Sequence, residues 1–520
     1  MIDKFLENLS DYPFLYLLSN SKIGLEKEAL RVDKYGTISY KMHPLHFGAS
    51  LTNKFITTDY SEALIEVVTP PCNSHEEAIN YLENIIGFVY RNLNDEYLWP
   101  ASMPCIIAGD RSIPIAYYGT SNAARMKTTY RRGLGNRYGR IMQVISGIHF
   151  NYSFSNEFWK SYKSFKKSNK SIKDFKSDQY FCIARNLLRN DWIILYLFGC
   201  SPAVCKSYLS GKETDMESFD EYTYFEKYAT SLRMGDIGYQ NNVEEDMGVH
   251  IDYNSIENYS KSLEKAISTS SKEYEKIGVH SEGYYKQINS NTLQIENEYY
   301  SSVRPKPDST IEKRPSKALI ENGVDYIELR SIDNNIFLNN GIDICQMRFI
   351  ELLIIYCLFY PDSKISDDEY FEIKDNLKKV AHNGRNNETC LKVGGRNLQV
   401  NIAVKNLIDS LMEIAKFMDK IMGDKNIYEK CILEQKKKIN DSKILPSNFM
   451  LNEMKNKGMT FYELCMENIW QQKKYFDEMK KDDDIIQILQ EETRKSILKK
   501  NELENKSGES YEDYIKKYFK

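Results

Sequence analysis

Short segments that alternate apolar and polar side chains recur along the chain, as in strands with one covered face. Residues 23–32 read Ile-Gly-Leu-Glu-Lys-Glu-Ala-Leu-Arg-Val, and residues 33–36 predict the turn that ends this strand. Side chains two positions apart on a strand share a face, so Glu26 and Glu28 are expected side by side. A solvated face would explain this pair, and so would a buried face on which magnesium offsets the two charges.

Other segments repeat this strand character with a polar set on one face. His149 alternates with Ile148 and Phe150, Glu296 lies in a second alternating run, and Glu328 shares a predicted face with Arg330. The predicted strand segments are residues 50–70, 147–154, 287–298 and 325–333.

Helical spacing of apolar residues dominates elsewhere, above all in the last third of the chain. Helices are predicted over residues 1–22, 75–93 and 180–209, and a helical pattern runs from 341 to 520. A Lys/Ser-rich segment, 155–178, predicts an exposed helix or insertion, and the proline-rich segment 301–316 predicts a solvated loop.

Composition describes an ordinary globular protein, with 42% hydrophobic and 28% charged residues in a chain of 520. The net charge of -4 gives no bulk basicity for nucleic acid. The most apolar runs, 192–200 and 349–360, are shorter than the roughly 20 residues of a membrane helix, so we expect no membrane association.

Ten cysteines are scattered without a C-x-x-C pair, and several lie inside apolar runs. Free thiols in such runs behave as small hydrophobes, so neither a zinc site nor a disulfide framework is expected. This cysteine usage predicts the reducing cytoplasm as the compartment.

The polar faces of the predicted strands favour metal-ligating and bidentate side chains over the mixture that a solvated sheet usually shows. Carboxylates, one imidazole and fixed guanidiniums together fit a divalent-metal phosphate site, although a solvated antiparallel sheet stays an alternative. No P-loop, strand-linked G-x-G-x-x-G or protein kinase signature is present. The polar set comprises Glu26, Glu28, Glu66, His149, Glu296, Glu328 and Arg330.

Eight motifs, in order and at nearly constant spacing, resemble the proteobacterial-type glutamate–cysteine ligases, also called γ-glutamylcysteine synthetases. They include Gly-Leu-Glu-Lys-Glu-Ala-Leu-Arg-Val, Thr-Thr-Asp-Tyr-Ser-Glu-Ala-Leu-Ile-Glu, Ile-Ser-Gly-Ile-His-Phe-Asn and Tyr-Ile-Glu-Leu-Arg-Ser. The resemblance is continuous from about Gly24 to Asp333 and loose in the C-terminal third. The motifs lie at residues 24–32, 57–66, 118–122, 136–139, 145–151, 229–233, 293–298 and 326–331.

This resemblance implies an α+β fold related to glutamine synthetase, with a curled antiparallel sheet forming a funnel surrounded by helices. It implies a catalytic region over 1–340 and a mainly helical part over 341–520, packed as one integrated unit. The implied reaction joins L-cysteine to the γ-carboxyl of L-glutamate through a γ-glutamyl phosphate, the first step of glutathione biosynthesis. ATP is the implied co-substrate and Mg²⁺ the cofactor, with Mn²⁺ as a possible substitute, and we expect a monomer.

The same resemblance assigns roles to individual positions. The implied magnesium ligands are Glu26, Glu28, Glu66, His149 and Glu328. The implied catalytic residues, which hold the phosphoryl group and glutamate or orient the amine, are Arg131, Arg233, Arg330 and Asp59. The implied cysteine pocket comprises Tyr60, Tyr130, Leu134, Gln143, Tyr239 and Tyr300.

The chain departs from the family pattern at Lys27, Ala29, Asn53 and Arg132, where Arg, Thr, His and an acidic residue are common. Arg132 could alter the charge near the cysteine site. Two alternatives stay open: a related ligase that joins glutamate to another amine, and a non-catalytic protein that binds glutamate or ATP.

Overall fold

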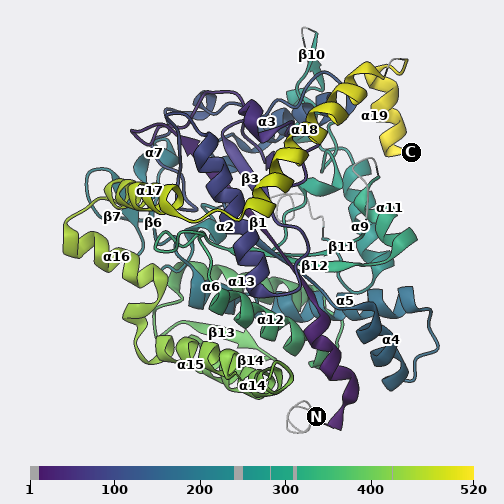
Figure 1. The fold of residues 1–520 in the computed structure, drawn as a ribbon, viewed down its shortest axis with the longest axis vertical. Coiled ribbons are helices and arrows are strands. Elements are labelled where there is room, and N and C mark those ends of the chain that lie inside the picture. Colours follow the sequence, from purple (N-terminus) through teal and green to yellow (C-terminus); the bar gives the residue numbers. More distant parts are fainter. Residues whose placement is uncertain (1–10, 239–249, 282, 309–312, 424, 507) are drawn as a thin grey trace.

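An antiparallel sheet of seven strands lies at the centre of the computed structural model, which describes residues 11–238, 250–281, 283–308, 313–423, 425–506 and 508–520 (Figure 1). The strands follow the order β11-β12-β5-β1-β3-β2, and β4 pairs with the far end of β1. The sheet is open and does not close into a barrel. Its strands are β1 (Lys22–Val32), β2 (Ile56–Thr58), β3 (Leu64–Val68), β4 (Tyr97–Leu98), β5 (Ile148–Ser153), β11 (Val303–Lys306) and β12 (Tyr326–Ile332).

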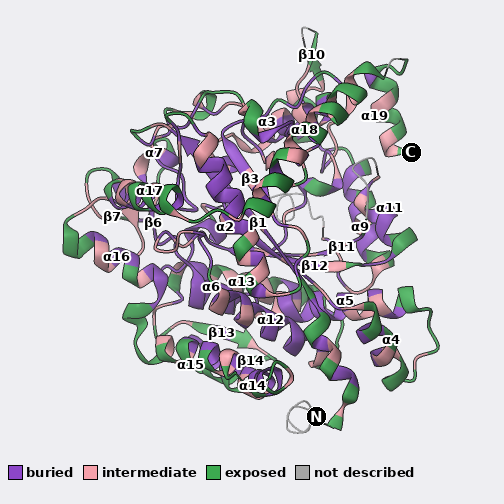
Figure 2. Cartoon of the chain, viewed as in Figure 1, coloured by how far each residue is buried: buried purple, intermediate pink, exposed green. Residues whose placement is uncertain are grey.

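The apolar face of the sheet is covered by helices. Ile148, Phe150 and Tyr152 project from β5 into this core, as the alternation predicts, and are fully buried. The covering helices are α2 (His75–Asn92), α5 (Ile172–Asn190), α6 (Trp192–Phe198) and α12 (Ile344–Phe359). Figure 2 shows this interior as the most buried part of the molecule.

One buried polar network crosses this core. Glu351 of α12 accepts hydrogen bonds from the hydroxyls of Tyr152 (2.9 Å) and Tyr428 (2.7 Å), and His75 of α2 lies 3.2 Å away. A buried carboxylate needs such partners, so this contact fixes α12 against the strand that carries His149.

The helical pattern predicted after residue 341 is confirmed, with one interruption by the hairpin β13 (Cys390–Val393) and β14 (Arg396–Gln399). The long helix α18 leads to α19, which packs against α3 at the end of the molecule opposite to α14 and α15 (Figure 1). After α12, the helices are α13 (Asp367–Asn383), α14 (Val400–Ile421), α15 (Ile427–Asn440), α16 (Pro446–Lys457), α17 (Phe461–Glu478), α18 (Asp483–Asn505) and α19 (Tyr511–Phe519).

Smaller elements surround the sheet. The remaining α-helices are α3 (Asn122–Tyr138), α4 (Asn156–Phe165), α7 (Lys206–Leu209), α9 (Ile256–Ser268), α10 (Lys272–Ile277) and α11 (Pro315–Asn322). The remaining strands are β6 (Ala203–Cys205), β7 (Glu217–Ser218), β8 (Thr223–Phe225), β9 (His280–Ser281) and β10 (Tyr284–Tyr285). The 3₁₀ helices are η2 (Pro13–Asn20), η3 (Leu45–Phe47), η4 (Asp110–Ser112), η5 (Met142–Val144), η6 (Leu232–Met234), η7 (Glu296–Glu298) and η8 (Ser442–Ile444).

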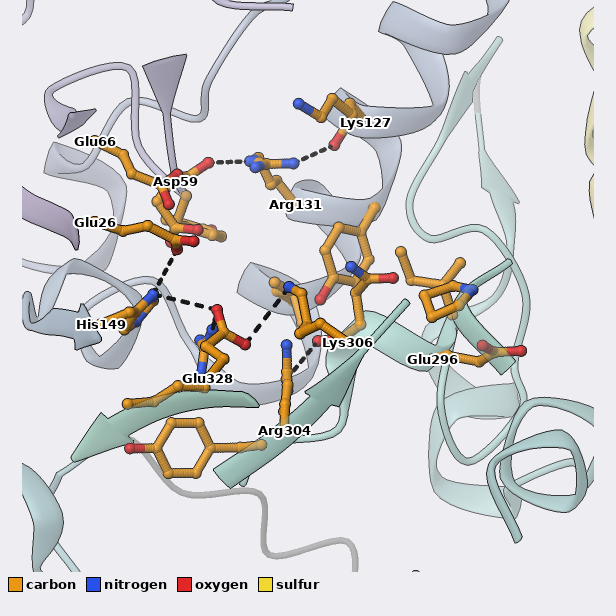
Figure 3. Close-up of a pocket in the computed structure, with 18 of the residues that line it drawn as sticks. Glu26, Asp59, Glu66, Lys127, Arg131, His149, Glu296, Arg304, Lys306 and Glu328 are labelled. Atoms are coloured by element: carbon orange, nitrogen blue, oxygen red, sulfur yellow. Dashed lines mark hydrogen bonds and ion pairs between the residues drawn. The ribbon is translucent and has the colours of Figure 1, made fainter. Parts of the chain in front are cut away.

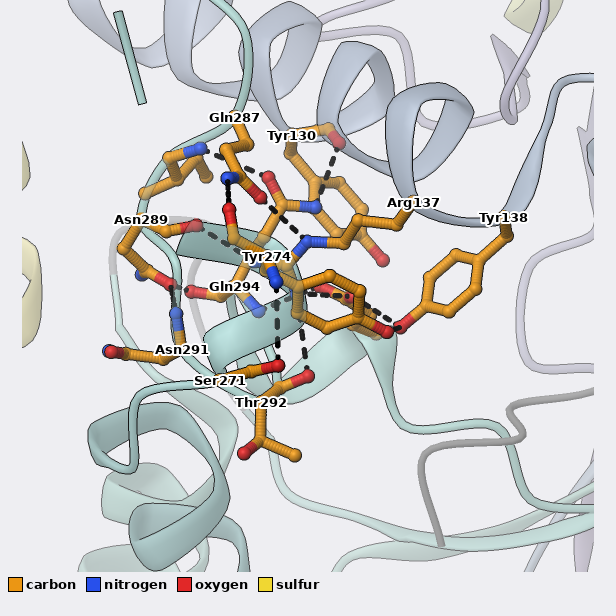
Figure 4. Close-up of polar contacts among 12 residues, drawn as sticks. Tyr130, Arg137, Tyr138, Ser271, Tyr274, Gln287, Asn289, Asn291, Thr292 and Gln294 are labelled. Carbon is orange, nitrogen blue, oxygen red and sulfur yellow. Dashed lines mark hydrogen bonds and ion pairs between the residues drawn. The ribbon is translucent and has the colours of Figure 1, made fainter. Parts of the chain in front are cut away.

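The strand predicted over 287–298 is wrong, because this segment folds as a loop that makes one isolated bridge, Asn291 to Ser270, and is otherwise held largely by side-chain hydrogen bonds (Figure 4). Asn289 Nδ2 donates to the Gln294 carbonyl, Gln294 Oε1 accepts from the Ile288 amide, and Glu298 Oε2 accepts from the Gln294 amide. The segment ends in η7. Its apparent alternation therefore reflects a folded loop.

Two further predictions are wrong in part. Residues 301–316, predicted as a loop, contain β11, an edge strand that tolerates Pro305 because proline lacks only one ladder donor. The helix predicted as one alternative over 155–178 is present as α4, but it is not simply exposed, because it buries Phe158 and Trp159 against the core. Of the helix predicted over 1–22, the described part forms the 3₁₀ helix η2.

One disulfide joins Cys105 to Cys205, with 5.3 Å between their Cα atoms, so the expectation of free thiols is wrong at this pair. The two residues are 100 positions apart in sequence. The fold alone brings them together, which no spacing pattern could reveal. The other eight cysteines are free thiols.

Candidate active site

A cavity of about 500 Å³ lies on the polar face of the sheet, between β1, β3, β5, β12 and the edge strand β11 on one side and α3 on the other. Every predicted site residue that the structure describes lines this cavity, and Tyr239 lies outside the described residues. They are Glu26, Glu28, Asp59, Tyr60, Glu66, Tyr130, Arg131, Leu134, Gln143, His149, Arg233, Tyr300, Glu328 and Arg330.

The register of the sheet explains how the acidic residues converge. Glu26 of β1 pairs with His149 of β5, and Glu28 pairs with Glu66 of β3. Residues directly opposite on antiparallel strands share a face, so alternation in each strand delivers the side chains to one place. The turn after β1 is fixed by Asp33, whose carboxylate accepts from the amides of Tyr35 and Thr37.

His149 lies at the centre of three carboxylates (Figure 3). Its Nδ1 is 2.8 Å from Glu26 Oε2 and 3.6 Å from Glu328 Oε1, and its Nε2 is 3.7 Å from Glu28 Oε1. Glu26, Glu66 and His149 each offer one ligand atom, and these three atoms lie within 4.8 Å of one another. This donor set of hard oxygens with one imidazole can hold a divalent metal ion.

The electrostatics of the cluster show an excess of negative charge. Burial raises the pKa of Glu66 well above its ordinary value, and the carboxylates of Glu26, Asp59 and Glu28 raise it further. Burial also raises the pKa of Glu28. Buried carboxylates repel one another unless a cation lies among them, so a divalent cation fits this group of side chains.

Glu328 lies in a more cationic part of the same cavity. Burial opposes its charge, but Lys306, Arg330 and His149 outweigh burial and hold its pKa well below the ordinary range. Lys306 Nζ is 3.5 Å from Glu328 Oε2, and Arg330 Nη1 is 3.2 Å from Glu328 Oε1. The carboxylate is therefore ionised and bordered by two fixed cations.

Two arginines lie beside this cation-bordered carboxylate. Arg330 lies two residues after Glu328 on β12, so both side chains project from the same face of the strand into the cavity. Its Nε is buried without a hydrogen-bond partner among the described residues. Arg233 Nη2 donates to the Arg330 carbonyl (2.8 Å), and its Nη1 is 3.7 Å from buried Asp333. Such held guanidiniums suit a phosphate or carboxylate ligand.

Helix α3 supplies the opposite wall. Ser121 caps it by accepting from the Ala124 amide, and Arg131 Nε donates to the Asp59 carbonyl. The Arg131 guanidinium also lies 4.7 Å from the centre of the Tyr118 ring. Small residues let other side chains approach the helix, because a Cβ at Gly133 would lie 1.9 Å from Gln294 Oε1.

The loop over 287–298 stabilises this wall from behind (Figure 4). Arg137 Nε donates to Gln287 Oε1 (2.9 Å), and Arg137 Nη1 pairs with Glu298 Oε1 at 2.9 Å, both side chains being fully buried. The guanidinium also lies 4.1 Å from the centre of the Tyr274 ring. Part of the basic stretch on α3 is thus structural, whereas Arg131 lines the cavity.

Several lining residues were missed by sequence reasoning. Arg304 and Lys306 alternate on β11, but the prolines of this segment led to the prediction of a loop instead of a strand. Lys127 lies in the basic stretch, and burial lowers its pKa to about 8. Tyr514 and Tyr518 are four residues apart on α19, where helical spacing alone gave no link to the sheet.

Comparisons with known proteins all point to one family. The family model described as glutamate-cysteine ligase matches residues 6–380. A curated glutamate–cysteine ligase of Alcanivorax borkumensis is 38% identical over 507 residues, 96% of each chain. That of Shewanella oneidensis is 38% identical and covers 99% of this chain and 98% of its own.

A solved structure is also similar over nearly the whole chain. The crystal structure of a Francisella tularensis glutamate–cysteine ligase in complex with AMP matches with a TM-score of 0.89 and 32% identity. The match covers 96% of this chain and 97% of that one. In the described residues, no helix has both the length and the apolar composition needed to cross a membrane.

Proposed function

Because this chain belongs to the glutamate–cysteine ligase family, we propose that it joins L-cysteine to the γ-carboxyl of L-glutamate with ATP as co-substrate. The observation that carries this proposal is the convergence of the acidic cluster and the arginines in one cavity on the sheet. The reaction would be the first step of glutathione biosynthesis, in the cytoplasm and by a monomer.

The residues that line the cavity would assist two successive steps, phosphoryl transfer and amide-bond formation. A γ-carboxylate oxygen of glutamate attacks the γ-phosphorus of ATP and ADP leaves; the cysteine amine then attacks the carbonyl carbon and phosphate leaves. Arg330 and Arg233 would bind the transferring phosphoryl group, since paired guanidiniums neutralise its oxygens. Arg131 and Asp59 would position glutamate and the amine, and the cavity walls would keep water from the acyl phosphate.

The acidic cluster fits Mg²⁺, with Mn²⁺ as a substitute. Glu26, Glu66 and His149 would hold one ion, and Glu28 and Glu328 lie next to them. Bound Mg²⁺ would neutralise phosphate oxygens and orient them. The raised pKa of Glu66 supports this assignment, because a divalent cation would offset the negative charge of the carboxylates around it.

The nucleotide base would occupy the end of the cavity away from the cluster. This end is lined by apolar and aromatic side chains from four elements, as a flat heterocycle requires. The AMP complex of the Francisella tularensis enzyme supports nucleotide binding by this family. The lining residues at this end are Leu263, Ile295, Leu319, Tyr514 and Tyr518.

Cysteine would bind at the α3 end. Tyr60, Tyr130 and Leu134 lie there with Gln143, and Tyr300 also lines the cavity. The buried hydroxyl of Tyr60 has no hydrogen-bond partner among the described residues, so a ligand could supply one.

Phosphate release with ATP, Mg²⁺ and glutamate, measured with and without cysteine, tests the proposal. We expect release to depend on all four components and γ-glutamylcysteine to accumulate. Release that is unchanged by cysteine but stimulated by another amine would support a related ligase. Binding of ATP and glutamate without any phosphate release would support the non-catalytic alternative.

A further inference from the structure

A second cavity, of about 570 Å³, opens where the N-terminus of α12 packs beside α15. It shares no lining residue with the candidate active site. Two free cysteines line it, Cys345 at the start of α12 and Cys431 on α15. They are 86 positions apart in sequence.

The two thiols are held next to each other. Cys345 Sγ lies 3.8 Å from the Cys431 carbonyl oxygen. Gln435 Nε2 donates to both Cys345 Sγ (3.4 Å) and the Cys431 carbonyl (3.3 Å). One amide therefore fixes both residues across the contact between the helices.

The surrounding charges distinguish the two sulfurs. The hydrogen bond from Cys345, with help from Arg348, lowers the pKa of Cys431 against the effect of burial. The same hydrogen bond, burial and nearby Glu434 and Asp343 raise the pKa of Cys345, whose thiol donates to Glu434 Oε2 at 3.1 Å. Cys431 is thus the more acidic thiol of the pair.

The two cysteines also differ in exposure, and here the less acidic Cys345 is the more accessible of the two. Cys345 is partly exposed, whereas Cys431 is only 4% exposed. A small molecule in the cavity reaches Cys345 first, and the buried Cys431 lies behind it. This is the arrangement of an accessible thiol with a resolving thiol.

We propose that Cys345 and Cys431 form a dithiol that low-molecular-weight disulfides convert into an intramolecular disulfide. In the first exchange the Cys345 thiol passes its proton to Glu434 Oε2, 3.1 Å away, as Cys345 Sγ attacks the external disulfide RS–SR; one RS group leaves and takes up that proton as RSH, and a mixed disulfide forms. Cys431 Sγ then attacks Cys345 Sγ, and the second RS group leaves as RSH with the other proton. The Sγ–Sγ bond replaces the RS–SR bond, so two protein thiols are oxidised as one disulfide is reduced.

The chain offers two internal controls. Cys390 is exposed and accessible to the same reagent, but its described contacts include no second thiol. Cys182 lies close to Cys357, with its Sγ 3.9 Å from the Cys357 carbonyl, but both residues are buried. Cys390 therefore shows how an accessible thiol reacts when no second thiol lies beside it. Cys182 and Cys357 show how two neighbouring thiols react when the reagent cannot reach them.

The test exposes the folded, full-length protein to 2-hydroxyethyl disulfide, quenches with N-ethylmaleimide in acid and maps cysteines by peptide mass spectrometry. In the wild type we expect a peptide pair cross-linked at Cys345 and Cys431, reversed by dithiothreitol. In Cys431→Ser we expect the mixed disulfide to accumulate on Cys345, and in Cys345→Ser we expect Cys431 to remain unmodified. Cys390 should carry the mixed disulfide in every variant.

A mixed disulfide that persists on wild-type Cys345 without the cross-link would overturn the proposal. So would an unmodified Cys345 in a sample whose Cys390 has reacted. Labelling of Cys182 or Cys357 in a serine variant would reveal unfolding, and the wild-type result then decides alone. This readout is independent of ligase activity, so the proposal and the proposed function fail separately.

Discussion

At the scale of single residues, Arg330 carries the most specific expectation of the site. It is bordered by Glu328 and Arg233, and its Nε has no partner among the described residues. We expect Arg330→Ala to lower turnover by about 10²–10⁵-fold, as for other groups that stabilise a transferring phosphoryl group. Steady-state kinetics with ATP, glutamate and cysteine measure this.

Two variants sharpen that test. Arg330→Lys keeps the charge but loses the planar fork, so its turnover should lie between those of the wild type and the alanine variant. Arg396→Ala removes an exposed arginine of β14 and should leave turnover unchanged. Near-wild-type turnover of Arg330→Ala would contradict a role in phosphoryl transfer.

Lys27 lies between Glu26 and Glu28 in sequence but on the opposite, apolar face of β1. It is buried, no hydrogen bond or ion pair to its ammonium group is found within the described residues, and burial lowers its pKa to about 7. Its ordinary pKa of about 10.4 applies to the unfolded chain, so the unfolded state binds more protons between these two values. The stability of the wild type should therefore rise with pH from about 7 towards 10.

Replacing Lys27 with methionine removes this buried charge at similar side-chain volume. We expect Lys27→Met to raise the unfolding free energy by on the order of 1–4 kcal/mol at pH 7 or below, with a gain that shrinks towards pH 10. Thermal unfolding at several pH values measures the difference. Lys22→Met, at an exposed position of the same strand, is the control, and an equal gain at all pH values would contradict the explanation.

At the scale of elements, strands with one apolar face were predictable from the sequence, and elements built from side-chain contacts were not. β1, β5 and β12 follow alternation that their buried faces require, so the acidic cluster could be predicted from them. The segment 287–298 shows the same alternation but folds around the buried pair of Arg137 and Glu298, a contact between distant segments.

Helix α19 is the element whose place in the site was least predictable. Tyr511 donates to Thr129 Oγ1 (2.9 Å), and the Arg125 guanidinium lies 4.2 Å from the centre of the Tyr511 ring, which docks α19 on α3. Docking then brings Tyr514 and Tyr518 to the cavity. This contact joins residues that are 382 positions apart, so the local sequence pattern of α19 could not predict it.

We expect Tyr518→Ala to raise the KM for ATP on the order of tenfold, because it removes aromatic surface from the proposed base site. The KM for glutamate should stay within twofold, since the acidic cluster lies elsewhere in the cavity. Initial rates at varied ATP and glutamate separate the two. Lys516→Ala, on the exposed side of α19, is the matched control; an unchanged KM for ATP in Tyr518→Ala would exclude α19 from the base site.

At the scale of the whole molecule, we propose that the regions 1–340 and 341–520 form one folding unit. Helix α12 belongs to the second region, yet Phe349, Leu352 and Leu353 are fully buried in the same core as β5, and Glu351 binds Tyr152. Separating the regions would expose this apolar surface and remove Tyr152 and His75, two of the three partners of the Glu351 carboxylate.

The four tryptophans allow this to be measured. Trp99, Trp159 and Trp192 report on the first region, and Trp470, whose ring lies 4.8 Å from that of Tyr97, reports on the second. In each of two variants, Trp470→Phe and one that keeps only Trp470, we expect guanidinium unfolding followed by tryptophan fluorescence and by far-UV circular dichroism to have the same midpoint, because neither region retains its core alone. Circular dichroism of both variants before denaturation checks that they fold. Fluorescence and circular dichroism midpoints that differ within one variant would show two independently stable domains, and the shared core around α12 would then be weaker than its burial indicates.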